Sequence, residues 1–135
     1  RAARLMWGLP YFHADMHATR EGQRVSYQTK RRSDERTPGV DVTYDVGDAL
    51  GPSMPGTLQH FLLERYYLFC EKQKRVLKGH VNHVPYPARA ATIDSFRQDL
   101  TLAAGLPDNG KLETVHFSEG VEVEVFGPDV VANVT

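Results

Sequence analysis

The chain has 135 residues, the length of one ordinary domain, with 16 Lys and Arg against 17 Asp and Glu. This balance of charge gives no support to a global nucleic-acid or membrane-surface role, and we expect neither partner. The single cysteine, Cys70, excludes an intramolecular disulfide and zinc-finger spacing, and a reducing cytoplasm is the simplest compartment.

The chain opens without an initiator methionine, and its first residues lead directly into sequence of structured character. This start is typical of a fragment from the middle of a longer protein. We therefore expect residues 1–135 to form a single domain that is part of a longer one, with part of any active site outside it.

Two histidines and an aspartate recur at every second position near the start, as His13, Asp15 and His17. On an extended strand such side chains point to the same face. They could be metal ligands, the polar lining of a pocket, or the solvated face of a surface strand. The outer two would lie about 13 Å apart between Cα atoms, which is too far for one shared ion. We predict no metal site and keep His13 as a candidate for pocket lining.

The next segments have the period of strands. Residues 24–30 and 40–46 each alternate β-branched or aromatic side chains with polar ones. This pattern predicts two half-buried strands. The connection at residues 33–39 contains Ser, Asp, Pro and Gly, so we expect an antiparallel hairpin with a long loop.

A helical pattern follows at residues 57–74, with Thr57 in the N-cap position and lysines in the last turn. At about 100° per residue its apolar side chains form one face. These side chains are Leu58, Phe61, Leu62, Tyr66 and Phe69. The sequence therefore predicts one long helix that packs on or into a sheet.

The rest of the chain is predicted to be mostly strand. Further strands are expected at residues 76–83, 89–93, 112–117 and 121–126, and a short second helix at residues 94–104. Because most connections suit antiparallel neighbours, the predicted class is α+β, mainly antiparallel β. The expected architecture is a curled sheet or barrel with one long packed helix and one short helix.

Arg65 falls near the centre of the apolar face of the predicted long helix. A guanidinium buried there without a partner would be costly. It must pair with a carboxylate from the sheet, face a cavity in which an anion binds, or extend to the edge of the face. Glu64 is only a loose partner for it, because adjacent helix positions diverge.

Familiar catalytic and cofactor motifs do not occur in the sequence. There is no H-E-x-x-H, no G-x-S-x-G, no G-x-G-x-x-G and no P-loop. Cys70 lies on the predicted long helix without an adjacent histidine, so we interpret it as a packing residue. No cofactor is predicted.

Three segments carry a resemblance to a known family, and they lie at residues 58–69, 82–87 and 115–126. They resemble the YqjF-like bacterial proteins of unknown function, within the acetoacetate-decarboxylase-like superfamily. The family's Thr-Glu-Arg-Tyr core corresponds to residues 63–66, with Leu63 in place of the Thr, and its His-x-Pro-Trp stretch to residues 83–86. The match covers nearly the whole chain but only the C-terminal half of the family's usual length. The resemblance implies an antiparallel barrel or cone around an internal cavity.

The decarboxylases of this superfamily use a lysine that closes a Gly-x-Pro-Lys stretch and forms a Schiff base with a keto acid. The corresponding stretch here is Gly8-Leu9-Pro10-Tyr11. A phenol cannot form an imine, and no other lysine lies in a matching context. The resemblance therefore implies a protein without Schiff-base decarboxylase activity.

The leading interpretation is a cytoplasmic barrel whose cavity binds a small anionic or carbonyl-bearing molecule. Arg65 would hold the anionic group, with Tyr11, Glu64 and His13 as polar lining. One alternative is a lyase- or hydratase-type enzyme that uses Tyr11 or Glu64 as acid or base. Another is a structural or self-association module, because exposed sheet edges would pair with another copy or with the absent half.

Overall fold

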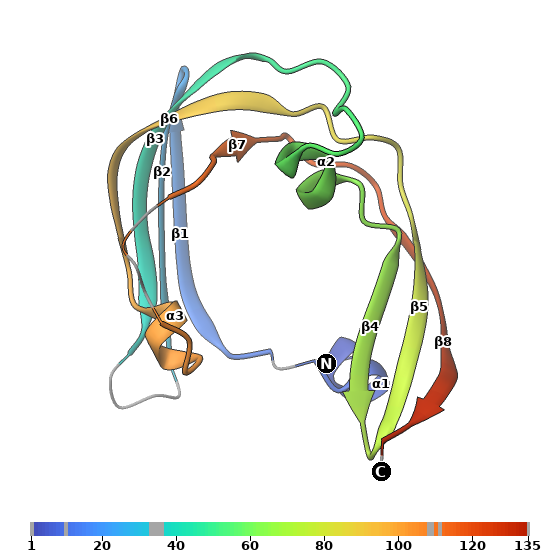
Figure 1. Ribbon diagram of the computed structural model, residues 1–135. Coiled ribbons are helices and arrows are strands. Elements are labelled where there is room, and N and C mark those ends of the chain that lie inside the picture. The colour runs from blue at the N-terminus through green and yellow to red at the C-terminus, as the bar shows by residue number, and fades with distance from the viewer. Residues whose placement is uncertain (1, 10, 33–36, 108–109, 111, 135) are drawn as a thin grey trace. The chain divides into compact units, whose positions relative to one another are not determined.

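Figure 1 shows the computed structural model, which describes residues 2–9, 11–32, 37–107, 110 and 112–134. Its internal contacts divide the chain into two compact units. Unit 1 consists of Arg1–Tyr11, Gly51–Pro87 and Glu119–Thr135, and unit 2 of Phe12–Leu50 and Ala88–Ser118. Over the described residues the secondary structure is mainly antiparallel β with short helices.

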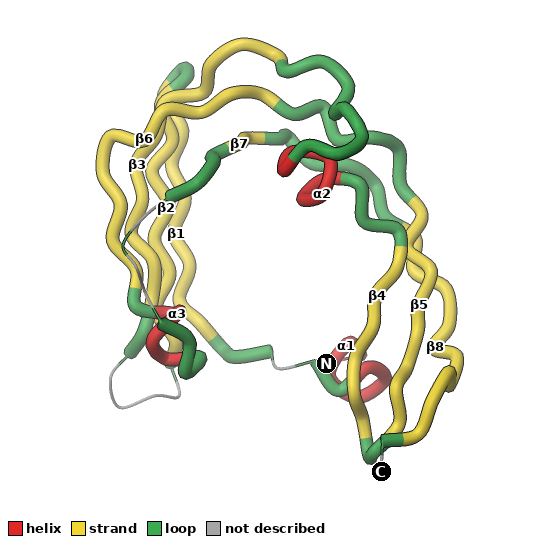
Figure 2. The backbone as a smooth tube through the Cα atoms, viewed as in Figure 1, coloured by secondary structure: helices red, strands yellow, loops and turns green. Residues whose placement is uncertain are grey.

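Unit 2 is built on an antiparallel sheet of strand order β1-β2-β3-β6-β7. These strands are β1 (Ala14–Glu21), β2 (Arg24–Arg31), β3 (Gly39–Ala49), β6 (Arg89–Gln98) and β7 (His116–Phe117). Figure 2 shows the long strands curving side by side, with α3 (Leu100–Ala103) at the end of β6. The register of β3 and β6 shifts twice along their length, and such bulges bend a strand.

The hairpin predicted from residues 24–30 and 40–46 is confirmed. Strands β2 and β3 pair antiparallel, with Val25 opposite Tyr44 and Tyr27 opposite Val42. Residues 33–36 of the connecting loop lie outside the described residues. Val25 and Val46 are buried, and the alternation and the register place them on the same face of the sheet.

Unit 1 is built on an antiparallel sheet of order β4-β5-β8. Its strands are β4 (Tyr67–Lys72), β5 (Arg75–Asn82) and β8 (Glu124–Asn133), and its helices are α1 (Ala2–Trp7) and α2 (Leu58–Leu63). Helix α1 contacts β4. The indole of Trp7 is buried against Gly79 of β5, where the missing side chain makes room for the ring.

The long helix predicted at residues 57–74 is wrong. The N-cap at Thr57 is confirmed, but α2 ends at Leu63, and residues 67–72 form β4 instead. Aromatic residues favour strands, and β4 gains a full ladder of hydrogen bonds with β5. Gln73 and Lys74 close that hairpin with positive φ angles of 53° and 60°. Such turns usually contain Gly or Asn, and neither residue is present at positions 73 and 74, so the turn has no recognisable sequence signal.

Other boundaries also differ from the predictions. The short helix expected at residues 94–104 is the end of β6 followed by α3, and the strand expected at 112–117 is confined to β7. The strand expected at 121–126 begins at Glu124 and continues to Asn133. The strand expected at 76–83 is confirmed as β5. None of the described helices is long and apolar enough to cross a membrane.

Candidate functional site

A group of polar side chains gathers around the C-terminal end of α2 in unit 1. Thr57 begins the helix by accepting a hydrogen bond from the His60 N–H at 3.2 Å. The helix ends where the Glu64 N–H donates to the His60 carbonyl oxygen at 3.0 Å. Because Glu64 is the C-cap, its side chain leaves the helix and meets the loop before α2 and the segment before β4.

The Glu64 carboxylate accepts two side-chain hydrogen bonds. The Ser53 hydroxyl donates to Oε1 at 3.2 Å, and the Tyr66 phenol donates to Oε2. Ser53 Oγ also lies 3.3 Å from His60 Nδ1. Since the single hydroxyl proton of Ser53 goes to Glu64, this second contact requires a proton on His60 Nδ1.

His83, from the segment after β5, adds an aromatic contact to this group. Its ring stacks on Tyr66 with centroids 4.8 Å apart, and it lies 4.9 Å from the ring of Tyr86. Its Nε2 is 3.4 Å from the carbonyl oxygen of Arg65. We call the half-buried side chains of Ser53, His60, Glu64, Tyr66 and His83 the Glu64 network.

The contacts within the Glu64 network shift the pKa values of Glu64 and Tyr66 in opposite directions. The hydrogen bond from Tyr66 lowers the pKa of Glu64 against partial desolvation, with smaller contributions from Ser53, His60 and His83. The same hydrogen bond, with desolvation, raises the pKa of Tyr66. At neutral pH Glu64 is therefore an ionised carboxylate that accepts hydrogen bonds. Tyr66 is a neutral phenol whose O–H is engaged in the hydrogen bond to Glu64.

Arg65 does not lie where the sequence placed it. The expected burial in a helix face is wrong, because α2 ends at Leu63 and Arg65 is exposed. Its guanidinium carbon lies 3.6 Å from the centroid of the Phe61 ring. Within the described part of the chain, this guanidinium forms no ion pair with a carboxylate.

Tyr11 and His13, the other two residues predicted to line a pocket, are distant in sequence from the Glu64 network. Tyr11 belongs to unit 1, follows α1 and is 62% exposed. His13 belongs to unit 2, directly before β1, and is exposed. Among the described residues, neither the Tyr11 phenol nor the Arg65 guanidinium hydrogen-bonds to the network. Pro10, of the stretch that precedes the histidines, lies outside the described residues.

The repeat of His13, Asp15 and His17 is exposed at all three positions. Asp15 pairs with Arg32, whose Nε donates to Oδ1 at 2.7 Å, and this hydrogen bond lowers the pKa of Asp15. Over the described ranges, no three His, Cys, Asp or Glu side chains are grouped as metal ligands would be. These contacts favour the solvated strand face among the three interpretations.

Glu64 is among the residues predicted from the sequence, whereas Ser53, Tyr66 and His83, which surround it, are not. Glu64 and Tyr66 are two residues apart, and that spacing brings side chains to the same side only in an extended segment. The assumption of a continuous helix therefore hid the contact. If the helix is taken to end at Leu63, the spacing of Glu64 and Tyr66 predicts that their side chains meet.

The Tyr66–Glu64 hydrogen bond should make stability depend on pH. Because the folded pKa of Glu64 lies below its ordinary value of 4.5, its stabilising contribution is present above pH 4.5 and is lost as pH falls through the folded pKa. We expect Tyr66→Phe to lower the melting temperature at neutral pH, with the difference shrinking in acid. Melting curves of both proteins across this range measure the effect.

Tyr67→Phe is the matched control for this experiment, since Tyr67 lies next in the chain and its phenol bonds to no carboxylate among the described residues. It should melt like the unmodified protein at every pH. A Tyr66→Phe difference that stays constant from neutral pH to well below pH 4.5 would contradict the assignment.

Comparison with known proteins confirms the resemblance to YqjF-like proteins. The model of the family DUF2071, described as an uncharacterized conserved protein, matches residues 1–122, which include the whole Glu64 network. The chain is similar to the uncharacterized protein YqjF of Bacillus subtilis, with 27% identity over 123 residues, 90% of this chain and 50% of the relative. It thus spans about half the length of that relative. No solved structure matches the chain.

Proposed function

The chain belongs to the DUF2071 family, and we propose that it binds a small molecule that carries an anionic or carbonyl group. The observation that carries this proposal is the state of Arg65. Its guanidinium is exposed, lies over the Phe61 ring at 3.6 Å, and has no carboxylate partner among the described residues. A cation in this state is available to bind a ligand anion.

The contact with Phe61 prepares Arg65 for this role. The guanidinium carbon lies over the ring of Phe61, and this contact favours one placement of the side chain, while the N–H groups donate at the edge of the guanidinium plane. A carboxylate binds that edge through two parallel hydrogen bonds. Because the guanidinium is already held, less conformational entropy is lost on binding.

We propose Tyr11 as a further polar contact of the ligand, and Glu64 as an acceptor for a hydroxyl group that the ligand carries, since both residues lie in unit 1 with Arg65. The Tyr11 phenol is exposed and has no hydrogen-bond partner among the described residues. It can therefore donate a hydrogen bond to a carbonyl oxygen of the ligand. His13 lies in unit 2 and stays a prediction from the sequence. The lowered pKa of Glu64 makes it a weak base at neutral pH, so binding is favoured over acid–base catalysis.

We further propose that binding does not proceed through a Schiff base. In the acetoacetate-decarboxylase-like resemblance, Tyr11 stands at the position of the catalytic lysine. Lys72 Nζ donates to the carbonyl oxygen of Leu5, and Lys78 Nζ lies 4.2 Å from the centroid of the Tyr67 ring. Both amines are therefore engaged, and Lys111 lies outside the described residues. Lys30 and Lys74 lie in no sequence context that matches the family's lysine.

The test is titration with acetate, pyruvate and acetoacetate, monitored by amide NMR shifts. Arg65→Ala should weaken binding by about tenfold or more, the scale of a lost charge-assisted hydrogen bond. Its melting temperature should stay unchanged, because Arg65 is exposed and pairs with no carboxylate among the described residues. Borohydride reduction in the presence of pyruvate should add no mass to the protein.

Arg75→Ala is the matched control, since it removes an exposed arginine from the same unit. It should leave the titrations unchanged. Equal losses in the two variants would reduce the effect to net charge and contradict the Arg65 site. A lysine labelled by borohydride would overturn the proposal that no Schiff base forms.

A further inference from the structure

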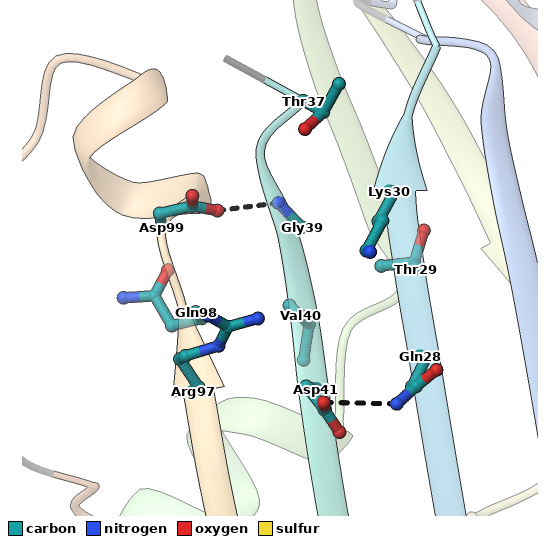
Figure 3. A pocket seen from close by; sticks show the side chains of 10 residues that line it. All are labelled: Gln28, Thr29, Lys30, Thr37, Gly39, Val40, Asp41, Arg97, Gln98 and Asp99. Carbon is teal, nitrogen blue, oxygen red and sulfur yellow. Dashed lines mark hydrogen bonds between the residues drawn. The ribbon is translucent and has the colours of Figure 1, made fainter.

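Unit 2 contains a hollow that involves none of the residues of the Glu64 network. Figure 3 shows it on the sheet where β2, β3 and β6 run side by side, and its volume is about 350 Å³. This volume lies in the range of cavities that bind small molecules. The residues that matter for its chemistry are Gln28, Lys30, Gly39, Asp41, Arg97 and Asp99.

The register of the sheet explains why the hollow exists. Gln28, Asp41 and Arg97 are paired across β2, β3 and β6, so their side chains share one face. Two residues further along that face, Lys30 is paired with Gly39. At Gly39 the backbones of β2 and β3 lie close together, since a Cβ there would be 2.0 Å from the carbonyl oxygen of Thr29, and no side chain from this position stands between Lys30 and Asp99.

The charged groups of the hollow are not paired with one another in salt bridges. Asp41 Oδ2 accepts a hydrogen bond from the Gln28 amide at 3.1 Å, and Asp99 Oδ1 accepts one from the Gly39 N–H at 2.6 Å. The side chains of Lys30 and Arg97 have no hydrogen bond or ion pair among the described residues. The two carboxylates are thus engaged by neutral donors, and the two cations remain available.

Figure 3 shows these two cations on opposite sides of β3. Arg97 extends from β6 towards β3, and Lys30 lies on β2 beyond it. Two cations on either side of the hollow can each donate to a different oxygen of one phosphate group, whereas a single arginine can satisfy a carboxylate. The charges of Asp41 and Asp99 balance those of the two cations, so the ligand must also carry groups that donate to these carboxylates. The second oxygen of each aspartate takes part in no hydrogen bond among the described residues and is free to accept one from a hydroxyl group.

We propose that this hollow binds a small hydroxylated phosphate monoester, such as a sugar phosphate. Lys30 and Arg97 hold the phosphate, and Asp41 and Asp99 accept hydrogen bonds from the hydroxyl groups. Gln28 and the Gly39 N–H keep the two carboxylates in position. This site lies wholly within unit 2 and is independent of the anion site proposed at Arg65.

The test uses glucose 6-phosphate, inorganic phosphate and glucose as probes, with binding to the whole chain measured by calorimetry. Glucose 6-phosphate should bind most tightly, inorganic phosphate more weakly, and glucose not measurably. The variant Lys30→Gln/Arg97→Gln should weaken glucose 6-phosphate binding at least tenfold. Both substituted side chains are exposed, so the melting temperature of this variant should equal that of the unmodified protein.

Two controls make the result decisive. Lys74→Gln/Arg75→Gln removes the same charge from exposed positions of unit 1 and should leave binding intact. Arg65→Ala should also leave it intact, so failure of this site and failure of the Arg65 site are distinguishable. No binding of glucose 6-phosphate, or equal losses in the two double variants, would overturn the proposal. Inorganic phosphate binding as tightly as the sugar phosphate would overturn the role of the aspartates.

Discussion

Replacement of Gly79 by alanine should destabilise unit 1 by about 1–3 kcal/mol, the usual cost of overpacking a core. A Cβ at this position would lie 2.3 Å from Cη2 and 2.8 Å from Cζ3 of the Trp7 indole. Trp7 is only 7% exposed, and its rigid ring cannot yield as the end of a flexible side chain would. The added methyl group must therefore displace α1 from the sheet or distort β5.

Chemical denaturation measures this effect directly. Trp7 is the single tryptophan of the chain, so its fluorescence reports on the core of unit 1. The midpoint of unfolding should fall in Gly79→Ala. Gly51→Ala is the control, because a Cβ at Gly51 meets nothing within 4 Å. If the two variants unfold at the same midpoint, the packing of Trp7 on Gly79 is not as described.

Replacement of Gly39 by alanine should destabilise unit 2 to a similar extent, about 1–3 kcal/mol. A Cβ here would lie 2.0 Å from the carbonyl oxygen of Thr29 and 3.0 Å from its carbonyl carbon. These are backbone atoms of β2, whose neighbour Lys30 is paired with Gly39. The clash can be relieved only if β2 and β3 separate locally and lose hydrogen bonds of their ladder.

Amide hydrogen exchange in β2 and β3 is the sharpest readout, because it follows the opening of that ladder. Gly47→Ala provides a control on the same strand, where a Cβ would make an ordinary contact of 3.4 Å with the Cβ of Ala90. We expect faster exchange at residues 28–31 and 39–42 in Gly39→Ala alone. Similar exchange in both variants would show that Gly39 is not sterically required.

The features predicted correctly were those that depend on local pattern. The hairpin of β2 and β3 follows from an alternation of apolar and polar side chains that needs no distant partner to be recognised. The cap at Thr57 likewise depends on atoms within one turn of helix. Family membership was also recognised from short segments, such as residues 58–69.

The candidate site was predicted only in part, because its contacts depend on more than local sequence pattern. Glu64 was named, but its hydrogen bond with Tyr66 forms only because the chain is extended after Leu63. Arg65 was expected to be buried because a continuous helix would have carried it into an apolar face. The hollow in unit 2 depends on the register of three strands, and the sequence of one strand does not contain that register.

The sequence by itself therefore determined the mainly antiparallel class, the strands of clear alternation and the start of α2. Only the tertiary structure decided that residues 67–72 form β4. Their side chains suit a helix face and a strand face alike, so local preference leaves the choice open. The hydrogen-bonded ladder with β5 decides it, and that ladder pairs residues as distant in the chain as Tyr67 and His80, which local preference does not sense.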